Sequence, residues 1–131
     1  MTARATPPGE LADEMQRVAD EVDAAFDAFL PVPPDARARL VEAMRYAVIG
    51  AGKRLRPLLL MATAQIYGVG REHAIRAGCA VEAIHTYSLI HDDLPCMDDD
   101  DLRRGRPSVH KAFDEATAVL AGDSLHAFAF E

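Results

Sequence analysis

Six aspartates stand within ten residues of one another, at positions 92, 93 and 98 to 101. Three arginines, Arg103, Arg104 and Arg106, follow directly. Carboxylates at this density repel one another unless cations share the site. They suit hard cations, and magnesium in proteins also takes phosphate oxygens, whose geometry matches the arginine fork. The stretch therefore predicts a magnesium–diphosphate site, and a solvated acidic turn is the alternative.

A second concentration of charge precedes it, in residues 50–57. Two glycines, Gly50 and Gly52, allow a tight turn or a close approach of the backbone to a ligand. Three cations follow Gly52: Lys53, Arg54 and Arg56. Pro57 suits the first turn of a helix running to Ile66, and a helix start favours anions. The segment predicts an anion site without the P-loop spacing, and a basic turn between helices is the alternative.

The helix that leads into the acids carries an unusual polar stripe. Residues 71–94 form an apolar helical pattern typical of a helix inside a bundle. His85, Ser88 and Asp92 nevertheless share one face of it, at spacings of three and seven. On an unbroken helix Asp98 would point about 120° away from Asp92. We therefore expect Pro95 to break the helix and return Asp98 towards Asp92, if both bind the same ions.

The composition indicates an all-α protein. Half of the 131 residues are hydrophobic, and the net charge is -7. Alanine and leucine are abundant and β-branched runs are scarce, which favours helices. We expect a flexible tail over 1–8 and one domain over 9–131. The predicted helices span 10–30, 35–49, 57–66, 71–94, 111–113 and 115–131, with a basic turn at 103–107.

Net charge, cysteine spacing and hydropathy argue against several classes of protein. The acidic balance argues against general nucleic-acid binding, and no apolar run reaches membrane-spanning length. The start has no signal-peptide pattern. Cys79 and Cys96 lack metal-type spacing and are interpreted as reduced thiols of a cytoplasmic protein. Cys79 is the expected core residue, and Cys96 belongs to the acidic loop.

The motifs together resemble the trans-isoprenyl diphosphate synthases, most closely the bacterial farnesyl diphosphate synthases. The similarity lies in residues 52–57, in His85, in Asp92–Asp98 with four residues between the acid pair and the third acid, and in Arg103–Gly105. It covers the chain beyond the tail but only the first half of the family's usual length. It implies an isoprenoid-synthase-type helical bundle around a central cavity, here truncated to its first half, and a homodimeric full-length protein.

The resemblance also implies a reaction and assigns residues to it. Isopentenyl diphosphate would condense with dimethylallyl or geranyl diphosphate, with Mg²⁺ as the cofactor. Asp92 and Asp98 resemble the magnesium ligands and, with Arg103, the catalytic residues. Asp93 supports them at the allylic diphosphate, to which Arg103 also binds. The residues that resemble the isopentenyl diphosphate site are Gly52, Lys53, Arg56, His85 and Arg104.

Tyr87 and Ser88 are the candidates for control of product length. Tyr87 precedes Asp92 by five residues, about 7.5 Å along a helix axis. In this family an aromatic residue there resembles a floor that stops chain growth, with the small Ser88 beside it. We therefore expect a farnesyl product, and geranylgeranyl diphosphate is the alternative. The competing interpretation is that Tyr87 simply packs in the core.

The sequence is also compatible with an incomplete synthase and with two other functions. The family's second aspartate-rich motif has no counterpart here, so we expect an incomplete synthase that is inactive alone and exposes an apolar helical face. A terpene cyclase is one alternative, although the 52–57 motif counts against it. A non-catalytic helical module that binds metal is the other. Asp99, Asp100 and Asp101 are interpreted as solvated or supporting charges.

Overall fold

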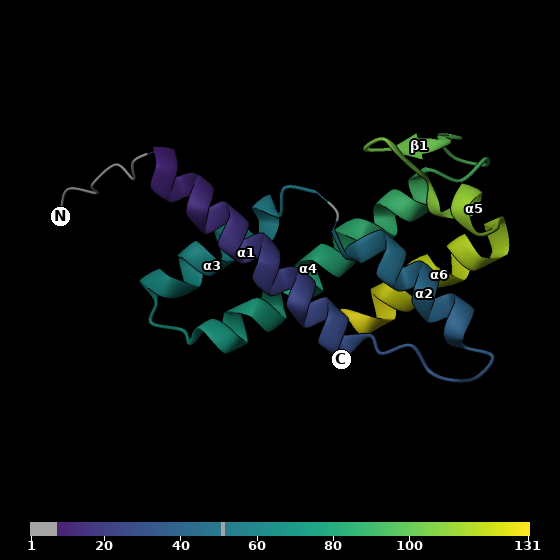
Figure 1. Ribbon diagram of the computed structural model, residues 1–131. Helices are drawn as coiled ribbons and strands as arrows, with labels where there is room; N and C mark the ends of the chain where they lie inside the picture. The colour runs from purple at the N-terminus through teal and green to yellow at the C-terminus, as the bar shows by residue number, and fades with distance from the viewer. Residues whose placement is uncertain (1–7, 51) are drawn as a thin grey trace.

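The computed structural model describes residues 8–50 and 52–131, and it is almost entirely helical. The expected tail lies mostly outside the described residues, and Pro8 already belongs to the first helix. The described residues form six helices and one short hairpin, arranged as in Figure 1. Their bounds are α1 Pro8–Phe29, α2 Ala38–Val48, α3 Leu55–Ile66, α4 Arg71–Asp92, β1 Leu102–Arg103, β2 Arg106–Pro107, α5 Val109–Ala112 and α6 Glu115–Phe128. The all-α prediction is confirmed.

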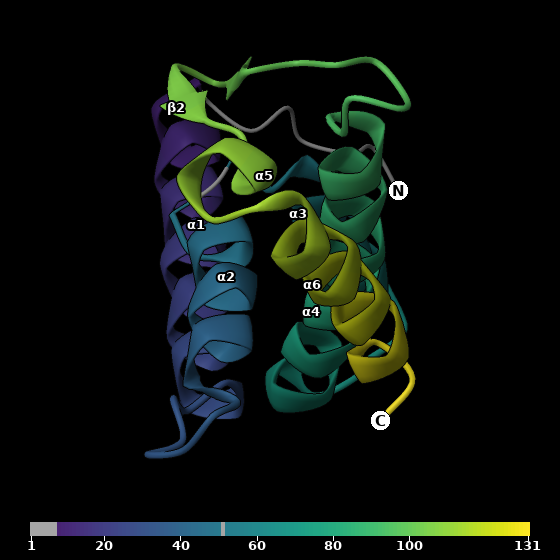
Figure 2. The ribbon, with the colours of Figure 1, turned by 90° about the vertical axis from the view of Figure 1, so that its right-hand side faces the viewer.

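The helices pack around α4, which contacts α1, α2, α3 and α6. In Figure 2, α1 and α2 stand side by side with α4 and α6 facing them, and the acidic loop and the hairpin cross one end. The opposite end is closed by aromatic contacts: Phe128 of α6 lies 6.4 Å from the rings of both Phe26 and Phe29 of α1. The charged motifs therefore gather at one end of the bundle.

The core contains apolar side chains at helical spacing. Val18, Val22, Phe26 and Leu30 are buried at spacings of four, as amphipathic periodicity requires. Leu11, which the same stripe includes, is exposed. Cys79 is buried and Cys96 is exposed, as expected. No described helix combines the length and the apolar character that a membrane span needs.

Local chemistry explains where the element ends differ from the prediction. The helix expected from Asp35 begins only at Ala38, because the Asp35 carboxylate accepts the backbone N–H of Arg37 and holds a turn. The basic turn at 103–107 is a hairpin in which Leu102 pairs with Pro107 and Arg103 with Arg106. Arg104 and Gly105 both have positive φ at its tip, as a tight hairpin turn demands.

Helix α6 is fixed at its start and in its middle. Asp114 caps it by accepting the N–H of Thr117 at 2.7 Å. Gly122 is buried against the ring of His91 on α4, where a Cβ would lie 2.5 Å from Cδ2. Gly122 is therefore a point of close packing between α4 and α6.

Apolar side chains remain exposed on several helices, as expected. They are Leu55, Leu59 and Ile66 of α3, Val81 and Ile84 of α4, and Val119 and Leu120 of α6. Exposed apolar surface of this extent is typical of a binding or packing face.

Candidate functional site

A basic pocket of about 320 Å³ lies where the turn after α2, the start of α3, the middle of α4 and the hairpin tip meet. Its lining is Gly52, Lys53, Arg54, Leu55, Arg56, Glu82, His85 and Arg104. The lining residues are far apart in the sequence: Gly52 and Arg104 are separated by 52 positions. The five residues that the family resemblance assigns to the isopentenyl diphosphate site therefore all line one pocket.

Gly52 is required at the pocket's edge for two reasons. Its φ is +73°, a conformation that side chains rarely adopt. The guanidinium of Arg104 also lies directly against it, and a Cβ at position 52 would stand 2.7 Å from Arg104 Cζ. The glycine thus allows the hairpin tip to dock on the turn after α2.

Arg54 is not one of the pocket's free cations, and the sequence-based grouping of three cations is wrong on this point. Its side chain is buried, with 3% exposed. Its guanidinium donates to Glu82 at 2.7 Å, to Asp23 at 2.8 Å and to the carbonyl of Val48. The backbone of Arg54 has φ 55°, a left-handed conformation. Lys53 and Arg56, by contrast, are exposed.

The remaining cations carry the pocket's charge. Within residues 8–50 and 52–131, Lys53, Arg56 and Arg104 have no carboxylate within ion-pair distance, and all three are exposed. Partial burial and, next, the charge of Arg56 lower the pKa of His85. Three unneutralised cations beside an imidazole suit a multiply charged anion, and two of them are guanidiniums that can bind phosphate oxygens in pairs.

The acidic loop turns back on the end of α4. The helix ends at Asp92, three residues before Pro95. The N–H of Asp98 then donates to the carbonyl of Asp92 at 2.8 Å, and the N–H of Asp100 donates to that of Asp93 at 3.1 Å. The expected return of Asp98 to Asp92 is confirmed for the backbone.

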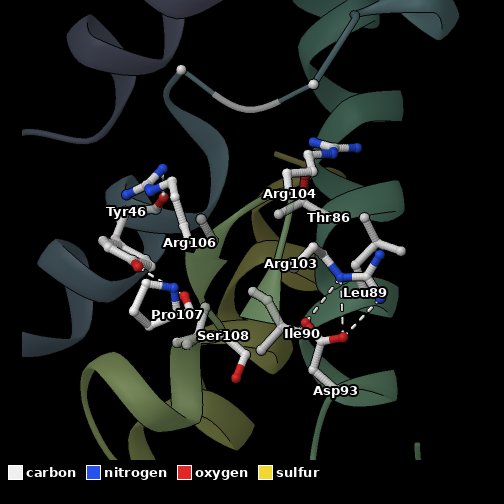
Figure 3. Close-up of a pocket in the computed structure, with 14 residues that line it drawn as sticks. Tyr46, Thr86, Leu89, Ile90, Asp93, Arg103, Arg104, Arg106, Pro107 and Ser108 are labelled. Carbon is white, nitrogen blue, oxygen red and sulfur yellow. Dashed lines mark hydrogen bonds and ion pairs between the residues drawn. The ribbon is translucent and has the colours of Figure 1, made fainter. Parts of the chain in front are cut away.

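Asp93 and Arg103 form an ion pair joined by three hydrogen-bond contacts (Figure 3). Arg103 Nε lies 3.0 Å from both carboxylate oxygens of Asp93, and Nη2 lies 2.7 Å from Oδ1. Asp93 is buried, with 2% exposed. Hydrogen bonding to Asp93 raises the pKa of Arg103. Asp93 therefore orients Arg103, while the side chain of Arg104 points away from this pair.

Asp92 and Asp98 keep their carboxylates available. In the part of the chain that the structure describes, neither takes part in an ion pair. Asp92 is half-buried and Asp98 is exposed. Oxygen donors that are open to water fit Mg²⁺, which holds few protein ligands and keeps several waters. The two aspartates would hold that ion, whereas the carboxylate of Asp93 is committed to Arg103.

Tyr87 is half-buried between two histidines. Its ring lies 5.7 Å from that of His91 and 4.9 Å from that of His126, both edge-on. Ser88 donates its hydroxyl to the carbonyl of His85 at 2.7 Å, so this side chain is satisfied within α4. The contact with His126 places Tyr87 between α4 and α6.

Two residues of this end were missed by sequence reasoning. Glu82, the partner of Arg54, is an acid in an otherwise apolar helix, three residues before His85, and that position was its only signal. His110 of α5 is buried with both ring nitrogens lacking a hydrogen-bond partner among the described residues. Nothing in its sequence neighbourhood distinguishes it.

Comparison with known proteins gives the class of this fold and site. A sequence profile described as polyprenyl synthetase matches residues 37–131. The chain is 50% identical over 123 residues to the farnesyl diphosphate synthase of Haemophilus influenzae, covering 94% of this chain and 42% of that protein. It is 63% identical over 90 residues to the chloroplastic geranylgeranyl pyrophosphate synthase of Capsicum annuum, covering 69% of this chain and 24% of that one.

A solved structure of a relative has the same fold. The crystal structure of an FPP/GFPP synthase from Zymomonas mobilis superimposes with a TM-score of 0.90 at 64% identity, over 92% of this chain and 43% of that chain. The fold is therefore that of the isoprenoid synthases. The chain belongs to the polyprenyl synthetase family, and it spans less than half the length of each of these three relatives.

Proposed function

We propose that this chain serves the magnesium-dependent condensation of isopentenyl diphosphate with an allylic diphosphate, and that the product is farnesyl diphosphate. The observation that carries the proposal is the basic pocket, where Lys53, Arg56 and Arg104 are exposed around His85 and have no ion-pair partner among the described residues. A terpene cyclase has no second diphosphate to hold there. A purely metal-binding module gives no reason for such a pocket.

Each residue has a separate task in this proposal. Lys53, Arg56 and Arg104 bind the diphosphate of isopentenyl diphosphate, with His85 beside them. Arg103, held by Asp93, faces the allylic diphosphate, and Asp92 and Asp98 hold Mg²⁺ there. The ion, when bound, supplies positive charge that stabilises the departing diphosphate.

Product length depends on Tyr87 in this proposal. Named relatives make different products, since one is a farnesyl and another a geranylgeranyl synthase. The bulk of Tyr87, braced by His126, supports an early stop to chain growth. Dimethylallyl or geranyl diphosphate would then be extended only to fifteen carbons.

Binding tests the pocket directly. Isothermal titration of isopentenyl diphosphate into the 131-residue chain should show binding that Arg104→Gln weakens at least about tenfold, the value of one charge-assisted contact. Arg106→Gln is the matched control, because Arg106 sits on the same hairpin but stacks on Tyr46 at 4.0 Å. Equal losses in both variants, or no binding by the folded chain, would contradict the assignment.

Turnover tests the reaction. The chain, and a chimera joining residues 8–131 to the remaining part of the Haemophilus influenzae relative, should be given isopentenyl and geranyl diphosphates with Mg²⁺. We expect farnesyl diphosphate from the chimera and none from the chain alone. Tyr87→Ala in the chimera should lengthen the product. A chimera that folds but makes no prenyl diphosphate would contradict the proposal.

Light scattering of the same samples tests whether the chimera forms the expected homodimer.

A further inference from the structure

The second half of the acidic loop forms a separate cluster with α5. Asp99, Asp101 and His110 each offer one ligand atom, and these atoms lie within 4.8 Å of one another. Asp99 and Asp101 are exposed, whereas His110 is 6% exposed. None of the three belongs to the basic pocket or to the Asp92 and Asp98 pair.

His110 is the independent sign that something binds there. Neither ring nitrogen has a hydrogen-bond partner within the described ranges, and both are shielded from solvent. A buried polar group without a partner loses its hydration with no compensating hydrogen bond, so such groups are rare unless a ligand or ion completes them. The imidazole also faces two carboxylates that could share an ion with it.

We propose that Asp99, Asp101 and His110 bind a divalent first-row transition ion such as Zn²⁺ or Mn²⁺, at a site distinct from that of Mg²⁺. One imidazole nitrogen with two carboxylate oxygens suits such ions, whereas Mg²⁺ and Ca²⁺ prefer oxygen alone. Waters complete the coordination, because both aspartates are open to solvent.

The ligand atoms of Asp99, Asp101 and His110 need to move only slightly to share one ion. Two ligand atoms at about 2.1 Å from one ion are about 3.4 Å apart in tetrahedral geometry. The exposed carboxylates can close the difference from 4.8 Å by rotating, while the buried His110 stays fixed. The backbone already brings the partners together, because the N–H of Ser108 donates to the carbonyl of Asp101 at 2.9 Å.

One competitor is present at the site. Lys111 Nζ lies 3.4 Å from Asp101 Oδ1 and partly neutralises that carboxylate. An incoming cation must displace this contact. Removing the lysine charge should therefore tighten metal binding, whereas removing either aspartate charge should weaken it.

The ion would join three segments. Asp99 follows Asp98 directly, Asp101 immediately precedes β1, and His110 belongs to α5. A metal on these three would hold the loop that carries Asp98 and the strand that carries Arg103. The site would act as a structural clamp beside the substrate-binding residues.

The test is titration of Zn²⁺ into the folded 131-residue chain, with excess Mg²⁺ present to occupy Asp92 and Asp98. All variants carry Cys96→Ser, because an exposed thiol binds zinc. Asp99→Asn and Asp101→Asn should each weaken binding at least about tenfold, since each removes one of three protein ligands. Asp100→Asn is the matched control, with the same charge change in the same loop, and should leave affinity within about twofold.

Two further readouts separate the site from general attraction. Mn²⁺ should broaden the ring proton resonances of His110, and Lys111→Gln should tighten Zn²⁺ binding. The proposal is overturned if the chain binds no Zn²⁺ under these conditions. It is also overturned if Asp100→Asn weakens binding as much as Asp99→Asn, or if Asp92→Asn removes the bound Zn²⁺.

Discussion

Single residues at the basic end have roles set by what touches them. Arg54 and Arg56 are two positions apart, yet Arg54 is buried between two carboxylates and Arg56 faces solvent. Asp92 and Asp93 are adjacent, yet only Asp93 is committed to an arginine. Neighbouring residues of the same type thus divide into members paired inside the protein and members left open to solvent.

Gly52 gives the sharpest test at this scale. Gly52→Ala would push the Arg104 guanidinium out of the pocket, because a Cβ stands 2.7 Å from Cζ. We expect isopentenyl diphosphate affinity to fall at least about tenfold, the value of one lost guanidinium contact. Gly50→Ala is the control: its φ of +72° gives the same backbone strain, but nothing lies within 4 Å of the new Cβ. Equal affinity losses in the two variants would show that backbone strain, and not the displaced arginine, is responsible.

His85 should link diphosphate binding to pH. Burial and Arg56 hold its pKa below the ordinary 6.5, so the ring is neutral at pH 7. A bound diphosphate favours the imidazolium and raises that pKa, so binding takes up protons and strengthens as pH falls from the raised pKa of the complex to the lower pKa of the free protein. Titration in two buffers of different protonation enthalpy measures the uptake. His85→Gln should show less uptake, and an unchanged value would contradict this role.

Elements could be predicted from sequence where a local pattern decides them. Local sequence signals predicted helices close to α1, α3, α4 and α6, because helical patterns and helix starts are properties of neighbouring residues. The hairpin and the late start of α2 escaped, since both depend on contacts that spacing does not reveal: strand pairing for Arg103 and the Asp35 turn for Ala38. The return of Asp98 could be predicted because helix geometry and Pro95 left few alternatives. The inward turn of Arg54 could not, because its partner Asp23 lies 31 residues away.

The contact between α4 and α6 can be tested by two glycines. Gly122→Ala should destabilise the fold by about 1–3 kcal/mol, the cost of overpacking, because its Cβ would stand 2.5 Å from the His91 ring. Gly78→Ala is the matched helical control, since its Cβ would meet Pro57 at an ordinary 3.4 Å. That variant should stay neutral or gain up to about 1 kcal/mol from helix propensity. Urea unfolding measures both, and a similar loss in both variants would argue against specific packing. Adding His91→Ala to Gly122→Ala should recover part of the loss.

At the scale of the whole molecule, one ion-pair network connects the core to the site. Arg54 joins Asp23 of α1 and Glu82 of α4, and its guanidinium lies over the Phe26 ring at 5.7 Å. The same residue fixes the turn from which Lys53 and Arg56 extend. Fold stability and the geometry of the basic pocket are therefore coupled through Arg54.

Glu82→Gln tests this coupling. The variant leaves the buried Arg54 charge with Asp23 as its one remaining carboxylate, so we expect a stability loss of about 3 kcal/mol, the low end for breaking a buried pair. Glu14→Gln is the control, because the side chains of Arg71 and Glu14 in this pair are 35% and 40% exposed, and such a pair is worth less than about 1 kcal/mol. Isopentenyl diphosphate affinity should fall in Glu82→Gln and stay constant in Glu14→Gln. A destabilised Glu82→Gln variant with unchanged affinity would show that the network supports only the fold. The turn that carries Lys53 and Arg56 would then keep its shape without the full set of carboxylates around Arg54.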